Sequence, residues 1–180
     1  RNYLIGSGYS EYLSSGSICN IKLPKNLKMA SKLPELLFTP SSKAEIGSHD
    51  VNISFEKMSE VVGQDMTEKI KEISFKIFQK ASDYLITKNI ILADTKFEFG
   101  LSDNGNLVLM DEVLTSDSSR FWISESYQEG VSPESLDKQF IRDYVKSISW
   151  DDSMPPPELP DDIVCKTFEK YKDLNRILTD

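Results

Sequence analysis

The chain has 180 residues, of which 39% are hydrophobic and 28% charged, and its formal net charge at pH 7 is −8. This length can bury one sizeable hydrophobic core, and the negative charge argues against a nucleic-acid-binding surface, which would carry a basic stripe. Two isolated cysteines fit reduced thiols better than disulfides, and no apolar run approaches the roughly 20 residues that span a bilayer, so we expect a soluble, cytoplasmic protein without a nucleic-acid or membrane partner.

Short strands and a long loop are expected in the N-terminal part of the chain. Residues 3–5 and 17–23 are predicted strands, and they flank a short helix near residues 10–14. Residues 24–50 are predicted to be a long irregular segment, and long loops of this kind are often functional. This part therefore predicts a scaffold of short elements with one candidate functional loop.

A long core-packing helix is expected in the middle of the chain. It is predicted to begin near Asp65, which with Glu68 three residues later resembles a capping box. It is predicted to end near Asn89, a residue type that tolerates the left-handed conformation of a C-cap. Its apolar residues recur at helical spacing: Ile70, Ile73, Ile77, Ala81 and Tyr84 or Leu85.

Two further helices are expected near the C-terminus. The first opens at Ser132-Pro133 and carries Lys138 and Arg142 four residues apart, a pair of cations on one face that suits a phosphate. Its apolar stripe consists of Leu136, Phe140, Tyr144 and Ile148. The proline-rich run 154–160 cannot be helical and marks a linker, after which a terminal amphipathic helix is expected.

A β-hairpin between these helices is the most informative element of the sequence. Residues 91–100 and 107–112 are strand-like, and an Asn-Gly pair at 104–105 lies between them. This pair is the strongest short-range signal for a two-residue type I′ turn, because both central residues need a positive φ. Counting outward from that turn places Glu98 directly opposite Asp111.

The predicted register brings two carboxylates together. Because strand side chains alternate between faces, Asp94, Lys96 and Glu98 are expected on one face with Asp111. Opposed like charges repel unless something compensates them, and Mg²⁺ favours one or two carboxylates together with substrate phosphates. The residues alone leave a second interpretation open, in which the ribbon faces solvent and Lys96 neutralises its acids.

The chain resembles the SAICAR synthetase family, which makes phosphoribosylaminoimidazole-succinocarboxamide in purine biosynthesis. The resemblance begins with the heptapeptide 94–100, Asp-Thr-Lys-Phe-Glu-Phe-Gly, which is similar to a family signature. Further blocks follow the family's order: residues 1–8, 38–45 with His49-Asp50, 111–122 and 137–143. The resemblance implies an α+β fold, a SAICAR synthase-like C-terminal lobe in which an antiparallel sheet packs with helices.

The resemblance also implies an activity and a set of site residues. The activity is an ATP-dependent ligase that joins carboxyaminoimidazole ribonucleotide (CAIR) to L-aspartate, with ATP and Mg²⁺ as cofactors. Lys96 is the implied catalytic residue, and Glu98 and Asp111 are the implied metal ligands. The implied substrate-binding residues are Arg1, Ser7, Lys43, Asp50, Ser119, Arg120, Lys138 and Arg142. His49, the one histidine, is more simply explained as a loop group than as a general base.

Several alternatives stay open at this stage. Without the family, Arg120 would be explained as a loop ion pair with Asp117. The family's N-terminal ATP-binding lobe, with its glycine-rich turn, is expected to be absent from this chain, since no phosphate-loop pattern occurs in it. We expect residues 1–152 to form the substrate- and metal-binding lobe and 153–180 to be a linker and a helix packed on the same domain. A non-catalytic nucleotide-binding module and a small-molecule kinase are the alternative functions.

Overall fold

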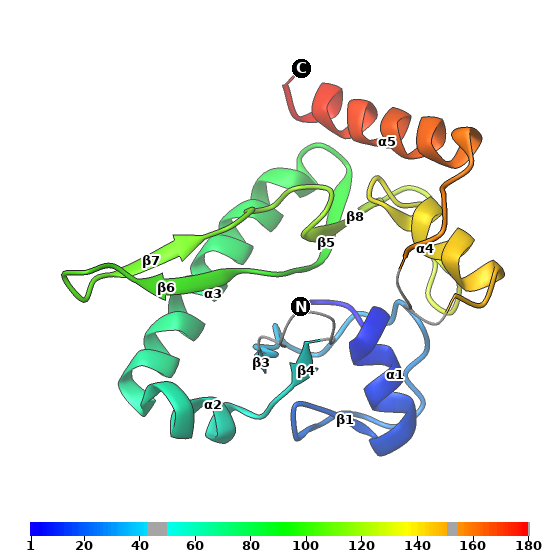
Figure 1. Cartoon of the computed structure of the whole chain (residues 1–180). Coiled ribbons are helices and arrows are strands. Elements are labelled where there is room, and N and C mark those ends of the chain that lie inside the picture. The colour runs from blue at the N-terminus through cyan, green and yellow to red at the C-terminus, as the bar shows by residue number, and fades with distance from the viewer. Residues whose placement is uncertain (43–49, 151–154, 180) are drawn as a thin grey trace.

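The computed structural model of the chain describes residues 1–42, 50–150 and 155–179, and its elements confirm an α+β protein (Figure 1). The helices of this part are α1 Gly6–Ser15, α2 Phe55–Val62, α3 Gln64–Ile86, α4 Gln139–Ser147 and α5 Asp161–Thr179. The strands are β1 Ser17–Ile18, β2 Ile21–Lys22, β3 Ser41–Ser42, β4 Val51–Asn52, β5 Ile90–Thr95, β6 Glu98–Leu101, β7 Leu107–Met110 and β8 Ser119–Ile123. Instead of one antiparallel sheet, the described strands form separate antiparallel pairs: β1–β2, β3–β4, β5–β8 and β6–β7.

The β5–β8 pair lies at the centre of the molecule and is buried on both faces. On one face, Leu92 and Phe121 join a core cluster with Phe78 of α3. On the other face, Ala93 and Trp122 join a cluster with Tyr3. Since strand side chains alternate, a pair covered on both sides needs apolar residues at nearly every position, which explains the unbroken run 90–93.

The N-terminal segment runs along the second face of this pair. The backbone N–H groups of Asn2 and Tyr3 both donate to the carbonyl of Ala93, at 2.9 and 3.3 Å. The predicted strand at residues 3–5 is reduced to an isolated bridge between Tyr3 and Lys32. Backbone bonds to residues 30–37 nevertheless hold this segment in place, so Arg1 is fixed beside β5.

A β-bulge interrupts β5 at the point where the N-terminal segment meets it. Leu92 pairs with Phe121, but Asp94 pairs with Arg120, so Ala93 is an extra residue on its strand. A bulge of this kind redirects the side chains that follow it. Here it places Asp94 directly across from Arg120.

The predicted long helix is confirmed as α3, and it begins within one residue of the predicted start, but the predicted capping box is wrong and the C-cap residue is Thr87 instead of Asn89. Gly63, with φ +87°, is the N-cap residue, and Asp65 is already inside the first turn, so no capping box forms. Asn89 is left-handed at φ +58°, as its position after the helix suggested. A short helix that the sequence did not indicate, α2, precedes α3 and begins with a side-chain cap in which Ser54 accepts from the N–H of Lys57.

The predicted register of the β6–β7 hairpin is wrong by one residue. Glu98 pairs with Met110 instead of Asp111, and Leu101 pairs with Leu107. The loop therefore has three residues, 103–105, closed by a bond from the Ser102 N–H to the Asn106 carbonyl. Of the Asn-Gly pair, only the glycine has a positive φ, which fits a three-residue turn with glycine in the left-handed position.

The strand that was expected over 91–100 is also divided. Its first half, β5, pairs with β8, whereas its second half, β6, pairs with β7. Asp94 and Glu98 therefore belong to different strand pairs, so the predicted common face is wrong for Asp94, whereas Lys96 and Glu98 do meet, at 3.0 Å. Figure 1 shows the β6–β7 ribbon with its tip pointing away from the rest of the chain.

The predicted strand 17–23 is a tight hairpin, β1–β2. Cys19 and Asn20 form its two-residue turn, with φ of +50° and +66°. These are the two positive angles of a type I′ turn. The type I′ geometry expected at 104–105 thus occurs in a turn that carries no glycine.

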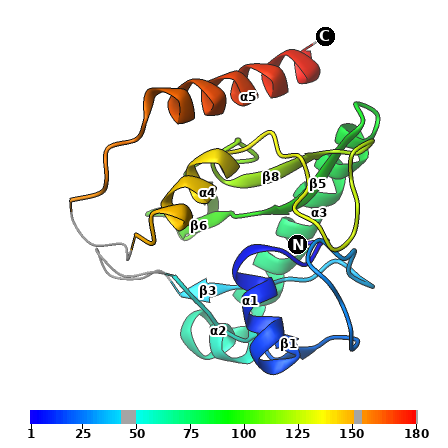
Figure 2. The same ribbon diagram turned by 90° about the vertical axis from the view of Figure 1, so that its right-hand side faces the viewer.

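The two C-terminal helices are confirmed, but the first is shorter than predicted: Lys138 is its N-cap residue and Ile148 its exposed C-cap residue, so the predicted apolar stripe and the predicted cation pair do not both lie within the helix. α4 begins at Gln139 instead of near Ser132, yet Leu136 is fully buried ahead of it in the core cluster. Residues 156–160 are not helical, and α5 follows them and packs on α4. In both views α4 lies between α5 and α1 (Figures 1 and 2). No helix in the described ranges is long and apolar enough to cross a membrane.

Leu174 of α5 tests whether this helix belongs to the same folding unit. Its side chain is 4% exposed in the cluster that contains Phe78 and Leu136. We expect Leu174→Ala to lower the free energy of unfolding by about 2–5 kcal/mol, because it leaves a cavity in a core shared with α3. Urea denaturation measures this. Val164→Ala on the same helix, at a side chain 46% exposed, is the control and should change stability by less than about 0.5 kcal/mol. A second, separate unfolding transition would contradict the single domain.

Candidate functional site

A buried ion cluster joins three segments that are distant in the sequence. Arg120 Nη1 donates to both carboxylate oxygens of Asp94, at 2.9 and 2.8 Å. Arg1 Nη1 lies 3.4 Å from Asp94 Oδ2 and also donates to the carbonyl of Ile5 at 3.0 Å. The side chains of Asp94 and Arg1 are 9% and 10% exposed, so two guanidinium groups share one carboxylate almost out of water.

The two arginines keep Asp94 ionised despite its burial. Burial alone would raise the pKa of this carboxyl, but Arg120 and then Arg1 outweigh it and hold the pKa below the ordinary value. The pairing with Arg120 corrects the interpretation in which Arg120 pairs with Asp117. With one carboxylate against two guanidinium groups, the cluster carries a net positive charge.

Glycines of α1 allow the guanidinium groups to approach the start of this helix. A Cβ atom on Gly6 would lie 2.5 Å from Arg120 Nη2, and one on Gly8 would lie 2.4 Å from Arg1 Nη1. Gly6 also has φ +60°, which disfavours other residues. No side chain caps the N-terminus of α1, and Ser7 is exposed between the glycines. Backbone N–H groups at an uncapped helix start favour anions.

Ser119 lies at the other end of this region and is buried. Its Oγ is 2.8 Å from the Oγ1 of Thr95 on the paired strand. Arg1, Ser7 and Arg120 are therefore grouped around the start of α1, and Ser119 is next to Arg120 in β8. Four of the predicted substrate residues thus come from this one part of the fold.

Lys96 connects the loop before β4 to the start of β6. Its Nζ is 2.9 Å from Asp50 Oδ2 and 3.0 Å from Glu98 Oε1, and its side chain is 53% exposed. Hydrogen bonds to Asp50 and then to Glu98 raise the pKa of the Lys96 ammonium above its ordinary value. The structure thus brings together three of the predicted site residues, one catalytic, one substrate-binding and one metal-binding.

The predicted metal pair lies on the same ribbon, although not in the predicted register. Asp111 directly follows β7, is exposed and has φ +61°, so strand alternation does not fix its direction. Among the described residues, no group of three or more His, Cys, Asp or Glu side chains could hold a metal. A donor set of two carboxylates fits Mg²⁺ only where a nucleotide and water supply the remaining oxygens.

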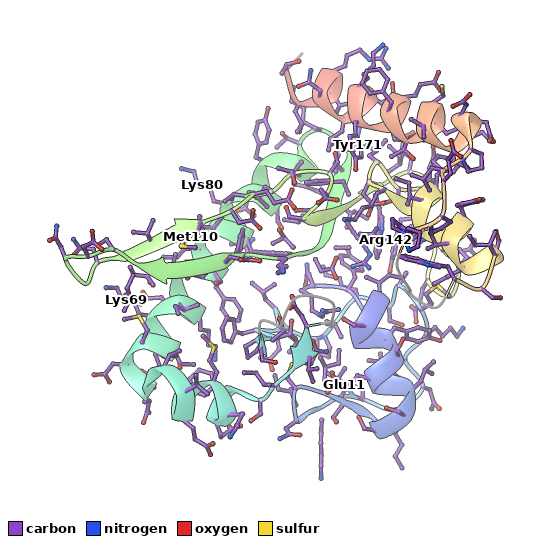
Figure 3. The ribbon with its side chains drawn as sticks, in the orientation of Figure 1. Glu11, Lys69, Lys80, Met110, Arg142 and Tyr171 are labelled. Carbon is purple, nitrogen blue, oxygen red and sulfur yellow. The ribbon has the colours of Figure 1, made fainter. Side chains whose placement is uncertain are left out.

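Lys138 and Arg142 are paired with carboxylates of their own. Lys138 Nζ contacts Asp117, and this hydrogen bond lowers the pKa of Asp117. Arg142 Nη1 donates at 2.8 Å to Asp137, which is fully buried. Figure 3 shows Arg142 on α4, below the α5 helix that carries Tyr171. Lys43, the remaining predicted substrate residue, and His49 lie outside the described residues.

Comparison with known proteins identifies the family of the chain. A sequence model of the SAICAR synthetase family matches residues 1–157. The chain belongs to the SAICAR synthetase family. It is 51% identical to a phosphoribosylaminoimidazole-succinocarboxamide synthase of Histophilus somni, over 99% of this chain and 63% of the relative.

Two solved structures of this family resemble the fold closely. The SAICAR synthase of Saccharomyces cerevisiae, complexed with SAICAR, is 41% identical with a TM-score of 0.83, over 99% of this chain and 58% of that one. A SAICAR synthetase in complex with ADP is 28% identical with a TM-score of 0.69, over 99% and 60% of the two chains. The chain thus spans less than two thirds of the length of these members of the SAICAR synthetase family.

Sequence reasoning missed two buried carboxylates of this SAICAR synthetase family member. Strand alternation assigns Asp94 to the ribbon face with Glu98, and Asp137 stands in the sequence only as the first residue of a family block. Each is an acidic residue with a side chain less than 10% exposed that bonds an arginine of the predicted site. The sequence did contain a signal for the buried position of Asp94, the first residue of the heptapeptide. This charged residue directly follows the four buried apolar residues 90–93. A charge at the end of such a run needs a partner.

The lowered pKa of Asp94 predicts how stability depends on pH. A carboxyl whose folded pKa lies below its unfolded value stabilises the fold above the ordinary pKa of 3.8, and this contribution is lost as the pH falls through the folded value. Asp94→Asn should therefore cost about 3–5 kcal/mol near neutral pH, and the difference from the wild type should shrink in acid. Urea denaturation between pH 7 and pH 2 measures this. Asp83→Asn, an exposed residue of α3, is the control; a pH-independent difference for Asp94→Asn would contradict the prediction.

Proposed function

We propose that the protein containing this chain is an ATP-dependent ligase that joins the carboxylate of CAIR to the amino group of L-aspartate, giving SAICAR, ADP and phosphate. The observation that carries the proposal is the 51% identity, over 99% of the chain, to a relative named phosphoribosylaminoimidazole-succinocarboxamide synthase. The solved relative with SAICAR and the one with ADP support the same product and nucleotide. We assign the reaction to the cytoplasm.

The chemistry explains why the site holds charges and needs no nucleophilic side chain. A carboxylate is a poor acyl donor, so ATP would first convert it to an acyl phosphate, which the aspartate amine then attacks with loss of phosphate. Phosphoryl transfer depends mainly on positioning and on neutralising charge. Lys96, with a pKa above its ordinary value, stays protonated and can offset the charge that builds on the transferred group.

We assign the imidazole ribonucleotide to the arginine side of the site. Arg1 and Arg120 lie beside the uncapped start of α1, where Ser7 is exposed, and this arrangement suits an anionic group. Arg142, and with it Lys138, would approach the phosphate of the same substrate. Asp50 and Lys43, from the loop before β4, would hold the imidazole ring and the aspartate.

We assign the nucleotide to the ribbon side of the site. Glu98 and Asp111 would hold Mg²⁺, which, when bound, supplies charge neutralisation at the nucleotide phosphates. No glycine-rich phosphate loop occurs in the sequence, and the relatives are longer than this chain. A further lobe, carrying that loop and a lysine, would complete the ATP site. The relatives' names favour neither a non-catalytic module nor a kinase.

Asp111→Asn tests the metal assignment in the active enzyme. The change keeps the side-chain shape but removes an anionic oxygen, which a hard cation requires. We expect turnover to fall by orders of magnitude and the Mg²⁺ concentration for half-maximal rate to rise. Steady-state rates over a magnesium series measure both. Asp103→Asn, at the tip of the same ribbon, is the control, and an unchanged magnesium requirement in Asp111→Asn would rule out the assignment.

Arg142→Ala tests the substrate assignment. If Arg142 binds the ribonucleotide phosphate, its loss removes a charge-assisted contact worth about 1.5–3 kcal/mol and raises the KM for CAIR roughly 10- to 100-fold. The constants for ATP and aspartate should change little. Lys146→Ala, which removes an equal charge from the exposed last turn of α4, is the control. Kinetics with each substrate varied in turn decide the matter, and an unchanged CAIR constant would exclude the role.

A further inference from the structure

We propose that Asp94 is a positioning residue: it holds Arg1 and Arg120 in one fixed arrangement so that together they bind an anionic group of the imidazole ribonucleotide. This inference rests on the proposed function and extends it to a residue that would not itself touch substrate. Four observations support it: the bulge, the geometry of the guanidinium groups, the close approach to two glycines, and the net charge.

The first observation is that the backbone of β5 is distorted at this place. The extra residue Ala93 puts Asp94 across from Arg120 on β8, and the carbonyl of Ala93 accepts the two N–H bonds that fix the segment after Arg1. One irregularity therefore places both arginines. Bulges are common next to active sites, where they redirect a side chain.

The second observation is that each guanidinium is fixed by more than one contact. Arg120 bonds both oxygens of Asp94 through Nη1, and its Nε is buried with no hydrogen-bond partner in the described part of the chain. Arg1 bonds the carbonyl of Ile5 through Nη1 and the hydroxyl of Thr39 through Nε, at 3.0 and 3.3 Å. A buried donor without a partner is costly.

The third observation is that both guanidinium groups pack closely against the start of α1. Arg120 and Arg1 lie against Gly6 and Gly8 at distances that leave no room for a Cβ atom. Both cations therefore meet the first turn of a helix that no side chain caps. Without Asp94 between them, the two positive charges would repel each other and leave this arrangement.

The charge of the cluster gives the inference its sharpest test. Two guanidinium groups and one carboxylate sum to +1, and Asp94→Asn raises this to +2. If charge alone governed binding, the variant would bind an anion more tightly. If Asp94 acts by positioning, the variant binds more weakly, because the arginines separate. The two explanations therefore predict opposite signs.

The experiment compares wild type, Asp94→Asn and Asp94→Glu in the active enzyme. Titration calorimetry measures affinity for CAIR, for the same molecule without its carboxylate and for the same molecule without its phosphate; kinetics give the KM for ATP. We expect Asp94→Asn to lose at least tenfold in affinity for CAIR with the ATP constant unchanged, and Asp94→Glu to recover part of the loss. The effect should vanish for whichever ligand lacks the anionic group that the arginines hold.

Three results would overturn the inference. They are an unchanged or tighter CAIR affinity in Asp94→Asn, an equal loss for ATP and CAIR, and a loss that persists for both truncated ligands. A wild-type enzyme that neither binds nor converts CAIR would instead refute the proposed function, and the inference with it. These outcomes separate the two claims.

A second variant keeps the test decisive if Asp94→Asn does not fold. Gly8→Ala leaves Asp94 in place but puts a Cβ atom against the Arg1 guanidinium, and alanine favours the helix at this position. We expect it to be folded by circular dichroism and to weaken CAIR binding at least fivefold without changing the ATP constant. Ser10→Ala, on the exposed face of α1, is the control. A folded Gly8→Ala enzyme with wild-type CAIR affinity would overturn the inference.

Discussion

The β5–β8 pair is buried on both faces, and this constraint determines which segments must pack around it. One face needs α3 and α5 to cover it, and the other needs the N-terminal segment. A charged residue can enter such a pair only at its end and only with partners, since an isolated buried charge is very costly. Asp94 meets both conditions, and its partners come from the two segments that the burial already brings together.

The predictions that held depend on regular spacing. Apolar residues at helical intervals located α3 and the C-terminal helix, and the proline run located the linker between α4 and α5. The heptapeptide indicated the family, which the match of the family model over residues 1–157 confirms. These signals are strong because each uses many residues at once, so one atypical position does not remove them.

The predictions that failed depend on single residues. The register of β6–β7 followed from assigning two residues to its turn, and a third residue, Asp103, shifted every pair by one. The bulge at Ala93 has no signal in the sequence, because alanine fits a regular strand equally well. Proximity in the sequence pairs Arg120 with Asp117, whereas its partner lies across the strand pair. Local patterns carry no information about such partners until the strands are aligned.

The C-terminal helix shows that a family model can end before the folding unit does. The family match stops at residue 157, before α5 begins. Leu174 of that helix nevertheless shares a core cluster with Phe78 and Leu136, far away in the chain. A protein truncated at the edge of the family match would lose part of its hydrophobic core and expose the remainder to water.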